Sequence, residues 1–158
     1  MSYVDSNLIS GERVLYSAKM HWFIFVPGSL LVLLGIYLFT IDREGGAGPV
    51  FGMFSILFGI PMIISAWIRK LTTELAVTSK RVIAKFGLIR RSTIELNHNK
   101  VESFHVEQGI IGRILGFGTL IVNGTGGGKT PIPNIDSPLS FRREAMQAID
   151  ASQSGKIS

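Results

Sequence analysis

The chain has 158 residues and a formal net charge of +5, with 16 lysines and arginines against 11 aspartates and glutamates, and this length suits about one domain of ordinary size. It contains no cysteine, which excludes a disulfide framework, thiolate metal sites and a cysteine nucleophile. Hydrophobic residues make up 46% of the chain, yet the mean hydropathy of +0.36 is high for a soluble protein, which argues against a fully soluble enzyme and indicates that the apolar residues are gathered in blocks.

Two long apolar segments account for the high hydropathy. Residues 22–41 and 50–68 contain no charged side chain, and only residues 42–49 separate them. At a rise of about 1.5 Å per residue, each segment makes a helix of roughly 30 Å, which matches the hydrocarbon core of a bilayer. We therefore predict a hairpin of two transmembrane helices.

A cleaved signal peptide is the alternative interpretation of the first segment. That segment is longer than the roughly 7–15 apolar residues of a signal peptide, and Asp5 and Glu12 lie in the stretch before it. No small-residue cleavage site follows it, and the second apolar segment returns almost at once. The pattern favours the hairpin.

Basic residues near the two segments predict their orientation. Lys19 precedes the first segment, and Arg69 and Lys70 follow the second, whereas the connecting loop contains only Arg43. Because Lys and Arg gather on the cytoplasmic side of membrane helices, both termini are expected in the cytoplasm. Residues 69–158 carry 13 basic and 7 acidic side chains, a net charge of +6, which favours a position close to anionic lipid.

The residues after the second segment have the pattern of short β-strands. Alternation and short apolar runs bounded by turn residues predict strands over 72–78, 81–86, 90–96, 101–108, 117–123 and 130–135. In the second of these, Val82, Ala84 and Phe86 are expected to point inward, and Arg81, Ile83 and Lys85 outward. We expect one cytoplasmic domain over 69–151, with 1–21 as an N-terminal cytoplasmic segment and 152–158 as a disordered tail.

A helix is expected after the last strand. Ser137 is a favourable N-cap residue, and Pro138 suits the first turn of a helix. Apolar side chains then recur on one helical face, which we expect to cover one end of the sheet. The residues on that face are Phe141, Ala145, Ala148 and Ile149.

Three segments of this region resemble a known family. They are residues 75–83 (LAVTSKRVI), 87–89 (GLI) and 112–119 (GRILGFGT). Together with the preceding hairpin, they make the chain similar to the bacterial PH-domain family of YdbS- and YdbT-like membrane proteins. The resemblance implies a small PH-like β-barrel or sandwich, capped by a C-terminal α-helix, and a multi-pass location in the bacterial cytoplasmic (inner) membrane.

Residues 124–130 match a phosphate-binding loop only in part. Such a loop needs a glycine, four residues and then Gly-Lys-Ser/Thr, followed by a helix. Counted back from Gly128, the first glycine would fall on Asn123, and Pro131 and Pro133 oppose a following helix. We expect a flexible hairpin loop here rather than a nucleotide site.

Other catalytic and cofactor sites are not expected either. His21, His98 and His105 have no second ligand at metal spacing. Glu102 and Glu107 fall on opposite faces of one strand, which disfavours an acid–base pair. We therefore expect no cofactor, no metal and no enzymatic activity.

One group of residues forms the candidate site, and it is called the basic cluster below. It consists of Lys80, Arg81, Lys85, Arg90 and Arg91. In lipid-binding eukaryotic PH domains, basic residues at the first β-hairpin hold inositol phosphates, but the usual phosphoinositide pattern is absent here. Three interpretations stay open: an ordinary solvated positive surface, a contact with anionic head groups, and a surface for a partner protein.

The sequence favours a non-catalytic, membrane-anchored interaction or assembly module, either a homo-oligomer or a part of a larger membrane protein complex. The alternative is an anionic-lipid sensor that uses the basic cluster, and an enzyme is less favoured. The bilayer is an expected partner. Nucleic acid is not, because the basic residues are not interleaved with stacking aromatic side chains.

Overall fold

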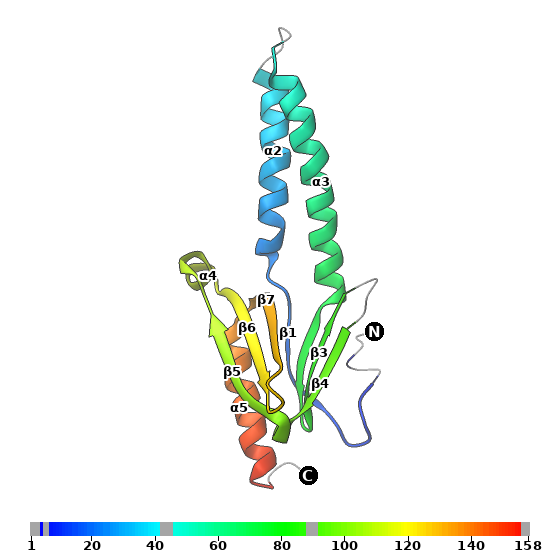
Figure 1. Cartoon of the computed structure of the whole chain (residues 1–158), viewed down its shortest axis with the longest axis vertical. Coiled ribbons are helices and arrows are strands. Elements are labelled where there is room, and N and C mark those ends of the chain that lie inside the picture. The colour runs from blue at the N-terminus through cyan, green and yellow to red at the C-terminus, as the bar shows by residue number, and fades with distance from the viewer. Residues whose placement is uncertain (1–3, 5–6, 42–45, 88–91, 156–158) are drawn as a thin grey trace. The chain divides into compact units, whose positions relative to one another are not determined.

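The computed structural model describes residues 4, 7–41, 46–87 and 92–155. The chain divides into two compact units. One is a β-rich unit formed by Met1–His21 together with Thr72–Ser158, and the other is the helical unit Trp22–Leu71 (Figure 1). The helical unit is thus inserted in the sequence between two parts of the β-rich unit.

The helical unit is a hairpin of two long apolar helices. The 3₁₀ turn η1 (Trp22–Phe25) leads into α2 (Val26–Ile41), and α3 spans Gly48–Thr72. The stretches Trp22–Ile41 and Gly48–Thr72 have mean hydropathies of 2.3 and 2.0, so both helices are long and apolar enough to cross a membrane.

The second helix is longer than the predicted span over 50–68. Its last turn contains Arg69 and Lys70. Both side chains find partners within the hairpin: Arg69 Nε donates to the Ser65 carbonyl at 3.4 Å, and Lys70 Nζ lies 5.4 Å from the centre of the Phe25 ring. The helix therefore continues through the charged residues that mark the end of the apolar segment.

Four glycines allow the two helices to pack closely against each other. A Cβ atom added to Gly28 would lie 3.1 Å from the Gly59 carbonyl oxygen, and one added to Gly35 would lie 2.7 Å from the Gly52 carbonyl oxygen. The converse holds from Gly52 and Gly59. Each helix presents its glycines seven residues apart, the spacing of a coiled-coil seam, and the small residues let the backbones approach each other.

The first sheet of the β-rich unit has four antiparallel strands. They are β1 (Val14–Ala18), β2 (Glu74–Thr78), β3 (Arg81–Phe86) and β4 (Ser92–Asn97), in the order β1-β2-β3-β4. No strand is predicted in the first 21 residues, so β1 is an addition to the predicted strands. It pairs with β2, with Ala18 opposite Leu75, so the helical hairpin connects two neighbouring strands.

The second sheet has three antiparallel strands. The 3₁₀ turn η2 (His98–Lys100) leads to β5 (Val101–Glu107), then come α4 (Ile110–Leu115), β6 (Phe117–Gly124) and β7 (Lys129–Asp136). A bridge between Met20 and Ile135 lies beside this sheet. The predicted strands over 81–86, 101–108, 117–123 and 130–135 are thus confirmed to within a residue or two, as two sheets followed by a helix.

The C-terminal helix α5 (Pro138–Gln153) closes the core. All four side chains predicted to share its apolar face are buried, which confirms that face. The ring of Phe141 is fully buried and meets the rings of Tyr16 and Phe104 edge-on, at 5.9 and 6.3 Å between centres. Tyr16 belongs to β1, so the unpredicted strand contributes to the same core.

The prediction that Ile83 points to solvent is wrong. Its alternation along β3 is correct, but its side chain is 0% exposed. It packs with Val4 and Ala76, and the half-buried Leu8 and Val14 lie against them. The N-terminal segment therefore covers the outer face of the first sheet and forms a second, smaller core.

Ser137 is the N-cap residue of α5, as predicted, but its side chain does not cap the helix. Ser137 has a positive φ of 48° and makes no side-chain capping bond. Its hydroxyl donates to Asp136 Oδ1 at 3.3 Å, and its amide donates to the Gly116 carbonyl at 2.8 Å. Pro138 does occupy the first turn, as predicted.

Candidate functional site

Two members of the basic cluster, Arg81 and Lys85, lie on the face of the first sheet that the N-terminal segment covers. Lys80 follows β2, whereas Arg81 and Lys85 lie at opposite ends of β3, four residues apart on one face. At about 3.3 Å per strand residue, this places the two β3 residues roughly 13 Å apart. Arg90 and Arg91 lie outside the residues that the structure describes.

Arg81 forms a two-pronged ion pair with Glu12 of the N-terminal segment. Its Nε and Nη2 atoms donate to Glu12 Oε1 and Oε2, both at 3.0 Å. The Glu12 side chain is 0% exposed and the Arg81 side chain is 12% exposed. This planar, paired geometry is the strongest form of a charge-assisted hydrogen bond.

Glu12 has two further hydrogen-bond donors. The Thr78 hydroxyl donates to its Oε1 at 2.6 Å, and the Ile9 amide donates to its Oε2 at 2.8 Å. Burial raises the pKa of Glu12, but these bonds and the Arg81 charge outweigh it and hold the pKa below its ordinary value. Glu12 is therefore a buried, ionised carboxylate with its oxygens occupied.

The rest of the Arg81 guanidinium is also engaged. Nη1 donates to Glu95 Oε2 at 2.6 Å, and Nη2 donates to the Asn7 carbonyl at 2.8 Å. One arginine thus joins the N-terminal segment, β3 and β4. Glu12 could not be predicted as the partner of Arg81, because no local spacing connects an acid at 12 with a base at 81.

The other two described members of the basic cluster also have partners. Lys85 Nζ lies 3.7 Å from Glu74 Oε1 across the β2–β3 pair. Lys80 Nζ donates to the Ser10 carbonyl at 3.1 Å on the exposed side of the turn. The structure therefore places Arg81 and Lys85 on one face of β3 with carboxylates beside both, and places Lys80 in the turn before that strand.

The glycine-rich segment forms a β-hairpin turn, as expected. The Gly127 amide donates to the Gly124 carbonyl at 3.0 Å, and the Gly124 amide donates to the Gly128 carbonyl at 3.1 Å. Gly127 has a φ of +75°, which favours glycine. Strand β7 begins directly at Lys129, so no helix N-terminus follows to bind a phosphate.

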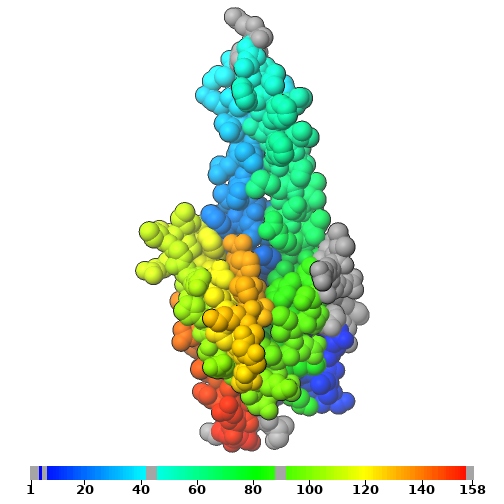
Figure 2. Space-filling view, in the orientation of Figure 1, coloured from blue at the N-terminus to red at the C-terminus, as the bar shows by residue number. Residues whose placement is uncertain are grey.

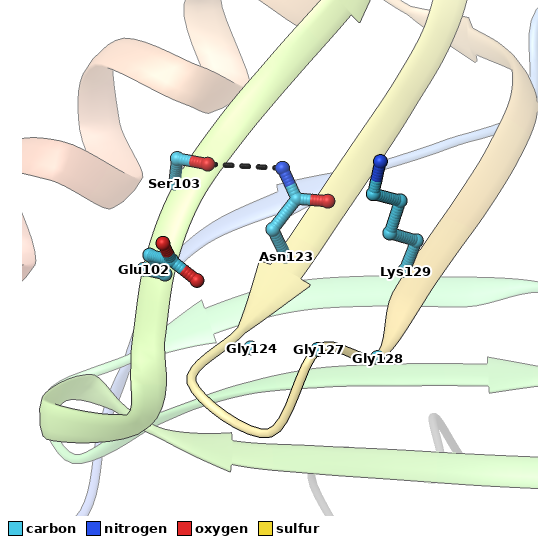
Figure 3. A pocket seen from close by; sticks show the side chains of 7 residues that line it. All are labelled: Glu102, Ser103, Asn123, Gly124, Gly127, Gly128 and Lys129. Carbon is cyan, nitrogen blue, oxygen red and sulfur yellow. Dashed lines mark hydrogen bonds between the residues drawn. The ribbon is translucent and has the colours of Figure 1, made fainter.

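A shallow depression of about 150 Å³ lies beside this turn. Figure 3 shows Asn123 and Lys129 on adjacent strands at its edge, with a bond of 2.9 Å from Asn123 Nδ2 to Ser103 Oγ. Asn123 Oδ1 is buried and has no hydrogen-bond partner among the described residues. Glu102 and Lys129 both line the depression and carry opposite charges. The lining therefore does not favour an anionic ligand.

The histidines do not form a metal or catalytic group. In the described ranges, no group of three or more His, Asp or Glu side chains is placed to hold a metal ion. His98 is buried, and burial lowers its pKa, although the Thr78 backbone and the charge of Glu12 oppose this shift. His21 stacks on the ring of Phe117, at 5.1 Å between centres.

A family model described as bacterial PH domain matches residues 25–153. None of the curated proteins matches the chain. The matched range contains both long helices, strands β2 to β7 and the C-terminal helix, and it begins after β1.

Proposed function

Because the chain belongs to the bacterial PH domain family, we propose that it is a non-catalytic, membrane-anchored interaction module. The helical hairpin is the anchor, and the β-rich unit is held at the cytoplasmic face of the bacterial inner membrane. There it assembles with proteins, either further copies of itself or members of a larger membrane complex.

The observation that carries the anchoring is the outer surface of the hairpin. Its glycines face the partner helix, while its large apolar side chains face outward. Those more than 55% exposed are Leu30, Leu33, Tyr37, Ile41, Phe51, Leu57, Phe58, Trp67 and Leu71. Water-exposed apolar surfaces of this extent are rare on soluble domains, whereas lipid covers them at no cost.

The contacts of the three described members of the basic cluster weigh against binding of a lipid head group. Arg81 is committed to Glu12 and Glu95, and Lys85 lies beside Glu74. An arginine already paired with two carboxylates has little charge left for a phosphate, because the neighbouring acids repel it. Lys80 differs from these two residues, because its Nζ atom donates to the Ser10 carbonyl in an exposed position.

The experiment is native mass spectrometry of the full chain, crosslinked in intact membranes and then released in a mild detergent. We expect masses above the 17.3 kDa of a single chain. Integer multiples indicate a homo-oligomer, and other masses indicate a complex, whose members are then sequenced. A single chain that carries only lipid adducts would contradict the proposal and favour the lipid sensor.

A second measurement addresses the lipid alternative directly. The full chain is placed in nanodiscs of neutral or anionic lipid, and hydrogen exchange is followed in β3 and in the turn before it. We expect the same protection in both lipids, since the described cations already have partners. Additional protection in anionic lipid, lost in about 0.5 M salt as the Debye length shrinks to a few ångströms, would instead support head-group binding.

A further inference from the structure

The short helix α4 carries an unusually exposed apolar surface. Four of its six residues are large and apolar, and Ile110, Ile111, Ile114 and Leu115 are 83, 57, 78 and 39% exposed. Among the described residues, no large apolar side chain of the two long helices is more exposed than the 70% of Leu71. In Figure 2 the yellow-green atoms of α4 protrude from the surface of the β-rich unit.

Tight packing at its base fixes α4 in this position. A Cβ atom on Gly112 would lie 2.5 Å from the Phe117 carbonyl oxygen, so only glycine fits there. Gln108 Nε2 donates to the same oxygen at 3.0 Å, and Gly116, with a φ of +81°, ends the helix. The isoleucines are therefore held outward by the fold rather than left exposed by a loose loop.

The base of α4 lies where the chain leaves the β-rich unit for the first long helix. Phe117, two residues beyond α4, stacks on His21 with the ring centres 5.1 Å apart. The His21 amide donates to the Asn134 carbonyl at 2.8 Å, which ties this point to β7. Trp22, the next residue, begins the first candidate span, and consecutive Cα atoms are about 3.8 Å apart.

We propose that α4 inserts its isoleucines into the interfacial layer of the membrane that the hairpin crosses. This inference rests on the anchoring proposed above and names a second contact of the same protein with lipid. The apolar face enters the boundary between head groups and acyl chains, as interfacial helices do. Arg113, the one charged residue of α4, extends its guanidinium toward the phosphates.

The absence of cysteine allows a clean labelling test in the full chain. Single cysteines replace Ile114, or Ile110 as a second position on α4, and each carries a polarity-sensitive fluorophore. The variants are reconstituted into phospholipid vesicles that contain nitroxide-labelled lipids. Thr125→Cys, at the opposite end of β6 from α4, is the matched domain control, and Leu33→Cys reports on the span.

We expect the labels at Ile114 and Ile110 to shift to the blue and to lose emission to shallow nitroxides more than to deep ones, since interfacial helices lie roughly 5–10 Å into the boundary. Thr125 should stay unquenched and Leu33 should be quenched. Quenching at Leu33 without quenching at either isoleucine would overturn the proposal and leave the anchor intact. A blue shift at α4 without quenching would overturn it in favour of a second protein copy. No quenching at Leu33 would overturn the anchor itself, and the α4 proposal with it.

Discussion

Glu12 attaches the N-terminal segment to strands β2 and β3 by hydrogen bonds. It receives donors from Ile9, Thr78 and Arg81, which belong to the segment itself, β2 and β3. A carboxylate that accepts this many bonds is stabilised in its charged form. Through Arg81 the network extends to Glu95 on β4, so one buried acid organises the outer face of the first sheet.

Glu12→Gln should therefore destabilise the β-rich unit. The glutamine amide has one acceptor oxygen, so it cannot accept hydrogen bonds from both Nε and Nη2 of Arg81. The guanidinium, whose side chain is 12% exposed, then loses a partner, at a cost of about 2–3 kcal/mol. Hydrogen exchange of β2 and β3 in the full chain measures the loss as a faster opening of these strands. Glu102→Gln, at an exposed carboxylate, is the control and should leave the exchange unchanged. Equal exchange in both variants would show that the network adds no stability.

The same residue predicts a pH dependence. The pKa of Glu12 in the folded chain lies below its ordinary 4.5, so its stabilisation is present above pH 4.5 and is lost as the pH falls through the folded value. The stability difference between the natural chain and Glu12→Gln should thus be constant near neutrality and shrink below pH 4.5. Burial also lowers the pKa of His98, and the charge of Glu12 opposes this shift. Protonation of His98 below about pH 6.5 therefore costs more stability in Glu12→Gln, so the difference should first widen there and then shrink below pH 4.5. A difference that keeps widening below pH 4.5 would contradict this assignment.

At the scale of elements, most of the secondary structure could be predicted from local pattern. Alternation and turn residues located six of the seven strands, and the apolar face of α5 was correct. Strand β1 was missed because it has five residues, its Leu15 is 41% exposed, and its partner β2 lies more than 50 residues away. The burial of Ile83 was missed for the same reason, since the segment that covers it is distant in sequence.

The hairpin could be predicted from the two apolar segments, but the contact between its helices could not. Small residues allow close helix packing, and the contact glycines are seven residues apart in each helix. Which small residues face the partner depends on the register of the two helices, and the loop between them does not determine that register.

Gly35→Leu should open the hairpin. The new side chain meets the Gly52 carbonyl and Ile56, and forcing it into this contact costs about 1–3 kcal/mol. The two tryptophans of the chain, Trp22 and Trp67, both lie in the hairpin, so their fluorescence during titration with a denaturing detergent reports its opening. Leu34→Ala, on the outward surface, is the control. A midpoint for Gly35→Leu no lower than for Leu34→Ala would rule out the glycine seam.

At the scale of the whole molecule, the β-rich unit is discontinuous in sequence. Strand β1 precedes the hairpin and pairs with β2, which follows it. A fragment that starts at Thr72 therefore leaves the edge of β2 unpaired and loses Tyr16 and Ala18 from the core. The hairpin is an insertion between neighbouring strands rather than an N-terminal addition.

This arrangement predicts which soluble fragments fold. Residues 7–21 joined by a short Gly-Ser linker to residues 72–155 should fold. Ala18 at the end of β1 lies opposite Leu75 near the start of β2, so a short linker can connect the two strands. Residues 72–155 alone should not. Dispersion of the amide signals in an NMR spectrum of each fragment measures this. A well-dispersed spectrum from the shorter fragment would show that β1 is dispensable.

The shared face of Arg81 and Lys85 on β3 could be predicted from strand alternation, but their partners could not. The carboxylates beside these two residues come from Glu12, Glu74 and Glu95 on three different segments. No prediction covers the exposed isoleucines of α4. Only the fold shows that their side chains are exposed.

The most direct test of the central claim is the accessibility of the two sides of the hairpin. Single cysteines at Gly46, in the loop between the helices, and at Ser154, after α5, are exposed to a membrane-impermeant thiol reagent in intact cells. A membrane hairpin with a cytoplasmic domain predicts labelling at Gly46, and labelling at Ser154 only after the cells are permeabilised. Labelling of Ser154 in intact cells, with Gly46 protected, would contradict it.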